Sequence, residues 1–139
     1  MKTKRPILLA EDDEVDAMTV KRALQELKVA NPLVITGNGE EALAYLRGGA
    51  KKKPCVVLLD LKMPKMDGIE FLKVVKQDHQ LRRIPVIVLT TSKEEQDRVH
   101  SFDLSVAGYM VKPVEYVKLV EVMRTVDLYW TLSELAEVS

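Results

Sequence analysis

A chain of 139 residues and 15.7 kDa has room for one ordinary hydrophobic core, so we expect a single domain over residues 1–139. Lysine and arginine together number 21, as do aspartate and glutamate, so the formal net charge is +0 and no overall field attracts nucleic acid. No apolar run approaches the roughly 18 residues of a membrane span. The basic start MKTKR leads into an apolar stretch that ends in acids, so no signal peptide is indicated.

Cys55 is the single cysteine, and the chain therefore cannot form an internal disulfide. Its neighbours in CVVLLD are apolar, which places it at the start of a buried strand as an inert side chain. A chain without disulfides fits a reducing compartment, and we expect a cytoplasmic protein.

Five short apolar runs recur along the chain and alternate with stretches of helical spacing. Runs this apolar, without polar alternation, are typical of strands buried on both faces. Strands that alternate strictly with helices favour right-handed crossovers and a parallel sheet covered by helices on both sides. The fold class is therefore α/β, and the predicted strands span residues 7–10, 33–36, 56–59, 86–89 and 109–111.

In such an open parallel sheet, ligands bind beyond the carboxyl ends of the strands. The residues that follow four of the predicted strands are polar or charged, and we expect them to meet at one edge of the sheet. They are Glu11, Asp12 and Asp13 after the first strand, Asp60 after the third, Thr90 and Thr91 after the fourth, and Lys112 after the fifth.

The consecutive acids in ILLAEDDE need an explanation, because adjacent like charges raise at least one pKa and cost stability. A solvated helix start is one explanation. The other is a divalent cation, since carboxylates from two strand ends are the hard oxygen ligands that Mg²⁺ prefers. If Glu11 and Asp12 hold the metal, Asp60 is placed both to contact it and to attack a phosphoryl group, and the product would be an aspartyl phosphate.

Two further strand ends supply what phosphoryl transfer needs, which is mainly positioning and neutralisation of charge. Lys112 can pair with one phosphate oxygen, and the hydroxyl of Thr90 can donate to another. Taken singly, such a threonine is more often a helix cap and such a lysine a solvated charge. Their occurrence at successive strand ends favours the functional interpretation.

The stretches ILLAEDD, VVLLDLKMPKMDGIEFL, IPVIVLTTS and GYMVKP, in this order and over nearly the whole chain, resemble the receiver domains of two-component response regulators. The resemblance implies a flavodoxin-like, doubly wound sheet of five parallel strands in the order 2-1-3-4-5, flanked by five helices. It also implies a sensor histidine kinase as the phosphoryl donor. The protein would be a phosphoacceptor switch with slow self-dephosphorylation and not an enzyme.

The same resemblance assigns roles to single residues. Asp60 would be the phosphoacceptor, Glu11 and Asp12 would bind Mg²⁺, and the backbone carbonyl of Lys62 would be a further metal ligand. Asp13 falls one position past the metal pair, so we expect it to have a secondary role.

Other roles implied by the resemblance concern the response to phosphate. Thr90 and Lys112 would sense the phosphoryl group, Tyr109 would change rotamer with Thr90, and the peptide bond between Lys112 and Pro113 would be cis. Gly68 would be needed for its backbone freedom in the loop after the acceptor.

Lys62 and Thr91 are less usual than the other site residues. Lys62 puts a long cation two residues after the acceptor, and Thr91 follows the switch threonine where a smaller residue is common. Our hypothesis is that both side chains crowd the path of the attacking water and lengthen the life of the acyl phosphate.

Three other functions are open at this point. The segment GNGEEA at 37–42 fits the G-x-G-x-x-A pattern of dinucleotide-binding proteins, although Glu40 and Glu41 would crowd the pyrophosphate. Aspartyl-phosphate hydrolases also use a strand-end aspartate and Mg²⁺, but they resemble one another in a second aspartate where this chain has Lys62. A receiver-like module that binds partners without phosphorylation is disfavoured, because no expected site residue is missing.

Residues 114–139 leave no room for a DNA-binding domain, so we expect a stand-alone receiver that signals by altered protein contacts. The segment is more apolar than a helix covering one sheet face usually needs, which fits either a thoroughly packed last helix or a homodimer surface. Its apolar positions are Tyr116, Val117, Leu119, Val120, Val122, Met123, Val126, Tyr129, Trp130, Leu132 and Leu135.

The motif LYWTLSEL, together with RRIPVIVLTTS and the lysines at 51–53, is similar to the small receivers that serve bacterial phytochromes and related sensor kinases. This narrower resemblance implies a bacteriophytochrome as the kinase and a homodimer through the last helix. Residues 130–139 would form a short C-terminal extension. Neither nucleic acid nor a membrane is an expected partner.

Overall fold

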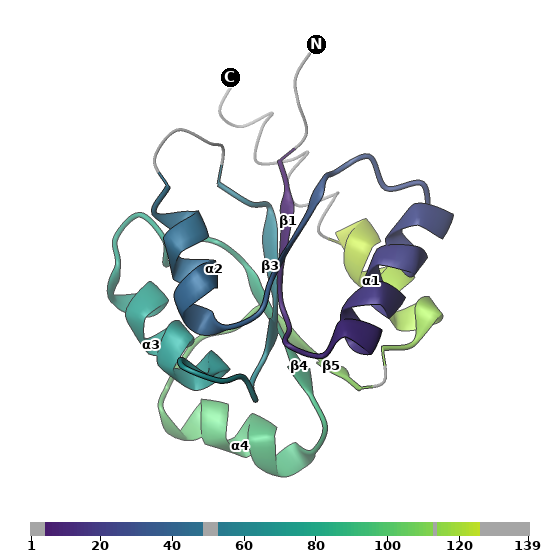
Figure 1. The fold of residues 1–139 in the computed structure, drawn as a ribbon. Coiled ribbons are helices and arrows are strands. Elements are labelled where there is room, and N and C mark those ends of the chain that lie inside the picture. The colour runs from purple at the N-terminus through teal and green to yellow at the C-terminus, as the bar shows by residue number, and fades with distance from the viewer. Residues whose placement is uncertain (1–4, 49–52, 113, 126–139) are drawn as a thin grey trace.

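A computed structural model describes residues 5–48, 53–112 and 114–125, in which strands and helices alternate as predicted (Figure 1). Residues 116–125 are helical and follow the last strand. No helix in these ranges has the length and apolar character needed to cross a membrane. The elements are β1 (Ile7–Ala10), α1 (Glu14–Glu26), β2 (Leu33–Thr36), α2 (Gly39–Leu46), β3 (Val56–Asp60), α3 (Gly68–Gln77), β4 (Val86–Thr90), α4 (Lys93–Ser101) and β5 (Gly108–Val111).

All five strands are parallel and form one sheet in the order β2-β1-β3-β4-β5, which confirms the predicted fold class and topology. Figure 1 shows α2 and α3 on one side of the sheet and α1 with the helical residues 116–125 on the other. Ala10 of β1 lies opposite Leu59 of β3 in the register. The residues directly after these two positions are therefore neighbours at the same edge of the sheet.

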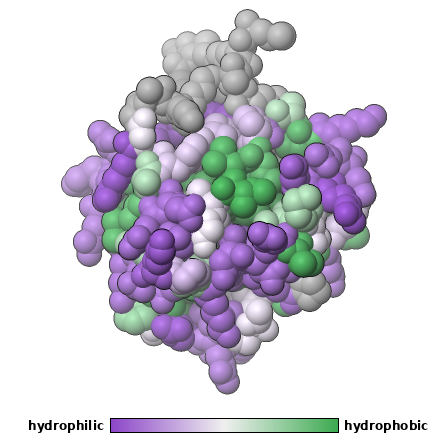
Figure 2. Space-filling view, viewed as in Figure 1, coloured by the Kyte–Doolittle hydropathy of each residue, from purple (hydrophilic) through white to green (hydrophobic). Residues whose placement is uncertain are grey.

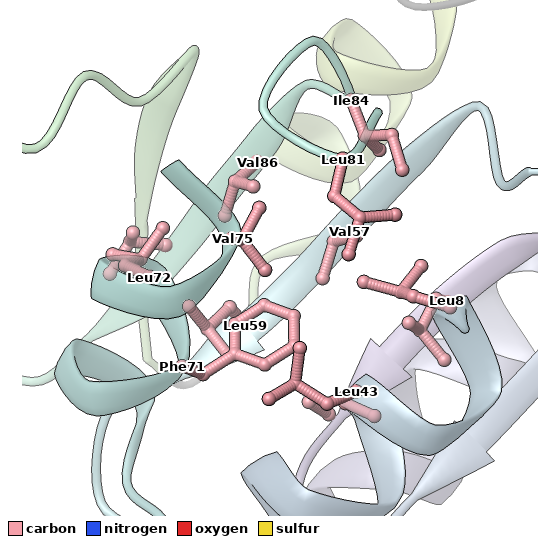
Figure 3. Packing of buried hydrophobic residues seen from close by; sticks show 14 of the residues in the cluster. Leu8, Leu43, Val57, Leu59, Phe71, Leu72, Val75, Leu81, Ile84 and Val86 are labelled. Atoms are coloured by element: carbon pink, nitrogen blue, oxygen red, sulfur yellow. The ribbon is translucent and has the colours of Figure 1, made fainter. Parts of the chain in front are cut away.

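The core consists of two clusters, one on each face of the sheet. On the first face, Leu8, Val57 and Leu59 of the sheet meet Phe71 of α3 (Figure 3). The second cluster lies between the sheet, α1 and the helical residues 116–125. Full burial of each large apolar side chain contributes about 1.5–3 kcal/mol, so the two clusters hold the strand ends in fixed positions.

The edge strands are less buried than the sequence predicts. β1, β3 and β4 are buried at every position, whereas β2 and β5 are only partly buried, with Ile35 at 42% and Val111 at 59% exposure. The prediction of strands buried on both faces is wrong for these two, because an edge strand has a neighbouring strand on one side only.

Figure 2 shows a mostly hydrophilic face that is interrupted by an apolar area near its centre.

Polar side chains define where the helices begin. Asp13 is the N-cap of α1 and accepts hydrogen bonds from the backbone N–H groups of Val15 at 2.8 Å and Asp16 at 3.0 Å. Asp67 caps α3 and Ser92 caps α4 in the same way. Such caps satisfy N–H groups that have no partner within the helix. The secondary role expected for Asp13 is therefore structural.

Packing within the chain accounts for the glycine pattern at 37–42. Asn38 caps α2 by accepting a hydrogen bond from the backbone N–H of Glu41 at 2.9 Å. A Cβ atom on Gly39 would lie 2.7 Å from the carbonyl oxygen of Met66, to which the Gly39 N–H donates at 2.9 Å. The close approach that requires this glycine is thus to the β3–α3 loop, and no dinucleotide is needed to explain it.

Gly68 lies against the end of β3. A Cβ atom there would be 2.5 Å from the carbonyl oxygen of Asp60 and 2.8 Å from the Cα of Leu61. Gly68 is the first residue of α3 and has no left-handed φ, so the expectation that it supplies backbone freedom is wrong. The position needs glycine because there is no space for a side chain.

We expect Gly68→Ala to lower the free energy of unfolding by about 1–3 kcal/mol, the usual cost of overpacking a close contact. Urea denaturation measures the change. Gly108→Ala is the matched control, because its Cβ would meet the Cδ1 of Ile87 at 3.5 Å, an ordinary contact. Equal stability of the two variants would contradict the expectation.

Candidate functional site

Three carboxylates meet at the carboxyl edge of the sheet. Glu11 and Asp12 follow β1, and Asp60 is the last residue of the neighbouring β3. One carboxylate oxygen of each lies within 4.8 Å of the others. Glu11 and Asp60 are buried and Asp12 is exposed, so the group is accessible from the solvent side. The acids meet as predicted, and their hard oxygen donors fit a divalent cation.

The ammonium group of Lys112, whose side chain is 12% exposed, lies against these acids. The Nζ of Lys112 lies 2.5 Å from the Oε1 of Glu11, 3.2 Å from the Oδ1 of Asp60 and 3.3 Å from the Oδ2 of Asp16. Its backbone N–H donates to the carbonyl of Thr90 at 2.7 Å, which fixes the chain beyond β5 against β4. One ammonium cannot balance all the carboxylates around it, so the site keeps negative charge that attracts a further cation.

Burial and crowding shift the pKa values of this group. Burial and the adjacent Asp60 carboxyl group raise the pKa of Glu11 to about 7, although Lys112 acts in the opposite direction. Burial alone would lower the pKa of Lys112, but its hydrogen bonds and charge interactions with Glu11 and Asp60 outweigh that and raise it. Lys112 is therefore charged at neutral pH, while Glu11 changes protonation close to it.

Asp16 belongs to the site, although it was not predicted from the sequence. It lies in the first turn of α1, four residues after Asp12, and its side chain is 34% exposed. The available signal was its position two residues after the acidic run, at the start of the predicted helix and therefore near the same edge of the sheet.

Thr90 and Tyr109, the predicted switch pair, come from adjacent strands. Thr90 is fully buried, and its hydroxyl accepts a hydrogen bond from the Nε2 of Gln96 at 3.4 Å. The hydroxyl of Tyr109 is buried without a hydrogen-bond partner in the described ranges, and its ring lies 5.5 Å from that of His100. Burial and the charge of Asp97 raise the pKa of Tyr109. One long hydrogen bond and one unpaired hydroxyl leave both residues able to take a new partner.

Lys62 is the second residue after β3. Its backbone carbonyl accepts no hydrogen bond within the described part of the chain, so this oxygen remains available as the predicted metal ligand. Its side chain is 78% exposed, with the Nζ 3.9 Å from the Oε2 of Glu95 on α4. Glu95 was not predicted from the sequence, although the spacing from Ser92 to Glu95 is a helix-capping signal.

Several predictions fall on residues that the structure does not describe. The cis peptide bond before Pro113, the apolar positions predicted beyond residue 125 and the extension at 130–139 all lie outside the described ranges. In the described part of the last helix, Leu119 and Met123 are buried against the sheet.

Comparisons of the sequence identify relatives of this chain. The family model described as the response regulator receiver domain matches residues 7–124. The probable methanogenesis regulatory protein FilR2 of Methanothrix harundinacea (strain 6Ac) is 39% identical over 127 residues, which cover 89% of this chain and 82% of that protein. Response regulator Rcp1 of Synechocystis sp. (strain ATCC 27184 / PCC 6803 / Kazusa) is 36% identical over 128 residues, covering 89% of this chain and 87% of Rcp1.

Solved structures agree with the sequence relatives. The bacteriophytochrome response regulator AtBRR has a TM-score of 0.81 and 42% sequence identity, with 91% of this chain and 94% of that chain covered. The Mn²⁺-bound form of Rcp1 has a TM-score of 0.73 and 35% identity, with 91% and 94% covered. A protein of this similarity thus binds a divalent metal ion, in keeping with the acids of the present site.

We expect the affinity of the protein for Mg²⁺ to rise with pH from about 6 to 8, because below its pKa of about 7 Glu11 holds a proton that the metal must displace. Isothermal titration calorimetry at several pH values measures the slope. Glu11→Gln removes the titrating group and should bind weakly with little pH dependence, whereas the exposed-site control Glu14→Gln should keep the wild-type profile. A wild-type affinity that is constant over this range would show the expectation to be wrong.

Proposed function

This chain belongs to the response regulator receiver domain family, and we propose that it accepts a phosphoryl group on Asp60 from a sensor histidine kinase. Phosphorylation by a histidine kinase is the general function of this family. The observation that carries the choice of Asp60 is the convergence of its carboxylate with those of Glu11 and Asp12 within 4.8 Å, next to the ammonium of Lys112. These three acids and the carbonyl of Lys62 would hold Mg²⁺.

The transfer itself forms one bond and breaks another. An oxygen of Asp60 forms the bond to phosphorus, while the bond between phosphorus and the imidazole nitrogen of the donor breaks. Bound Mg²⁺ would neutralise charge on the phosphoryl oxygens. Lys112, 3.2 Å from the Asp60 carboxylate, can pair with a phosphoryl oxygen. The hydroxyl of Thr90 accepts a hydrogen bond from Gln96 and can donate its own proton to another phosphoryl oxygen.

Phosphorylation would affect residues on β4, β5 and α4. A change of the Thr90 side-chain rotamer that moves its oxygen toward the phosphoryl group would release Gln96 on α4, and the unpaired hydroxyl of Tyr109 can follow by a change of rotamer. Phosphorylation would then shift a population between two arrangements of this surface and alter protein contacts there.

Loss of the phosphoryl group from this chain would be slow, as suits a switch that is not an enzyme. Lys62 stands where aspartyl-phosphate hydrolases resemble one another in an acid-base aspartate, and a charged ammonium cannot take a proton from attacking water. The hypothesis that Lys62 and Thr91 crowd the path of that water stays a prediction.

The likeness to AtBRR supports a bacteriophytochrome as the kinase, since that protein of 42% identity is named a bacteriophytochrome response regulator. We place the protein in the cytoplasm, where such a kinase domain and a chain with a single, buried cysteine both belong.

A homodimer is supported by apolar side chains on the edge of the sheet and on the last helix. Tyr116 and Val117 are 46% and 64% exposed, and Val111 of the edge strand β5 is 59% exposed. An apolar surface of this kind beside an edge strand fits contact with another copy of the chain.

Incubation of the purified protein with acetyl phosphate and Mg²⁺ tests the acceptor. We expect intact mass to show a gain of one phosphoryl group, which a chelator prevents and Asp60→Asn abolishes. Asp103→Asn, which changes an exposed aspartate of another loop, should be phosphorylated like the wild type. No gain in the wild type would overturn the proposal in favour of a binding module that works without phosphorylation.

Light scattering tests the dimer. We expect Val117→Asp to shift the protein from dimer to monomer, because it places a charge in the proposed apolar contact. Val15→Asp, at a side chain that is 75% exposed on α1, should leave the mass unchanged. A wild type that is monomeric both with and without a phosphate mimic would rule the dimer out.

A further inference from the structure

Glu95 joins the two loops that flank the acceptor site. It lies in the first turn of α4 and is only 8% exposed. Its Oε1 accepts hydrogen bonds from the backbone N–H of Thr91 at 2.7 Å and from the Thr91 hydroxyl at 3.0 Å. Its Oε2 lies 3.9 Å from the Nζ of Lys62. One buried carboxylate thus connects the loop after Asp60 with the loop after β4.

The two contacts of Glu95 differ in strength. The hydrogen bonds to Thr91 are short, and they keep the carboxylate in place at the start of α4. The contact with Lys62 is long, and the lysine side chain is 78% exposed. An ion pair with one exposed partner contributes little, so a stronger anion nearby can draw Lys62 away at small cost.

A phosphoryl group on Asp60 would be such an anion. It carries about −1.5 to −2 charges near neutral pH, more than a carboxylate. Lys62 follows Asp60 by two residues, and its flexible four-carbon stem allows the ammonium to take more than one position. Among the described residues, Glu95 is the acid that lies within ion-pair distance of Lys62. The lysine therefore has two possible anionic partners, one in each phosphorylation state.

We propose that Glu95 competes with the phosphoryl group on Asp60 for the ammonium of Lys62, so that phosphorylation transfers this cation from α4 to the acceptor site. The inference rests on the proposed function of Asp60. Glu95 is then a positioning residue, because it acts on the phosphoryl group through Lys62. Transfer of the Lys62 ammonium breaks its ion pair with Glu95, which connects the β3–α3 loop to α4, while Thr91 stays hydrogen-bonded to Glu95.

Competition of this kind predicts whether each substitution strengthens or weakens the binding of a phosphoryl mimic. A carboxylate that holds Lys62 in the unphosphorylated state must weaken the binding of a phosphoryl mimic by the same free energy that it gains from the lysine. Removal of the charge on Glu95 therefore strengthens binding of the mimic, and removal of the charge on Lys62 weakens it. When Lys62 has no charge, the charge on Glu95 no longer matters to this competition.

The experiment measures the affinity of the full chain for beryllium fluoride with Mg²⁺, followed by fluorine NMR. Glu95→Gln keeps the size of the side chain and an oxygen that can accept from Thr91, but it cannot form the ion pair. We expect it to bind the mimic about two- to five-fold more tightly, as the loss of one partly exposed ion pair allows. Glu94→Gln removes an exposed acid from the same helical turn and should match the wild type.

Lys62→Gln completes the test. It should bind the mimic more weakly than the wild type, and adding Glu95→Gln to it should change nothing further. Equal affinities of Glu95→Gln and the wild type would overturn the inference. A gain that persists in the Lys62→Gln background would also overturn it, because the cause would then be the general field of the acid and not competition for the lysine.

Two results separate this inference from the proposed function. Binding of the mimic to the wild type that depends on Mg²⁺ and is lost in Asp60→Asn supports Asp60 as the acceptor, whatever the Glu95 variants do. Absence of that binding removes both proposals. If Glu95→Gln unfolds by circular dichroism, the Lys62→Gln variant alone decides, because wild-type affinity in that variant contradicts the competition.

Discussion

The burial of two carboxylates side by side, Glu11 and Asp60, is the constraint on which the site depends. Two buried negative charges at neighbouring strand ends are costly unless positive charge stands next to them. Lys112 supplies one such charge from the end of β5, and its contacts with both acids offset part of the cost. The raised pKa of Glu11 shows that this compensation is incomplete. Because negative charge remains uncompensated, binding of a further cation would stabilise the site.

The fold brings these buried acids together and also limits how the surrounding backbone can move. Parallel strands bring their carboxyl ends to one edge, and the sheet order puts β1 beside β3, so that acids far apart in the chain become neighbours. The start of α3 packs against the backbone of Asp60 so closely that Gly68 has no space for a side chain. A displacement of the Asp60 backbone would therefore press on the start of α3, because close-packed elements have little free space.

The proposed switch can be described as a change of partners for two lysine ammonium groups. Lys112 is shared among carboxylates in the described structure, and Lys62 lies near the acid at the start of α4. A new dianion on Asp60 competes for both ammonium groups and for the hydroxyl of Thr90. Each of these groups leaves a partner on another element when it moves. In the proposed switch, local electrostatics would thus change the contact of α4 with the loop after Asp60 without any large movement of the core.

The sequence by itself determined the alternation of strands and helices, and hence the parallel sheet, because its apolar runs and helical spacing repeat in strict order. It also predicted that Glu11, Asp12, Asp60 and Lys112 lie together, since side chains at strand ends of such a sheet meet at one edge. Only the tertiary structure decided the partners within that edge. The contacts of Lys112 with Asp16, of Glu95 with Lys62 and of Gly68 with the Asp60 backbone join segments that are not related by any local periodicity. The partial exposure of β2 and β5 likewise depends on their place in the sheet order, which the packing of all the elements sets together.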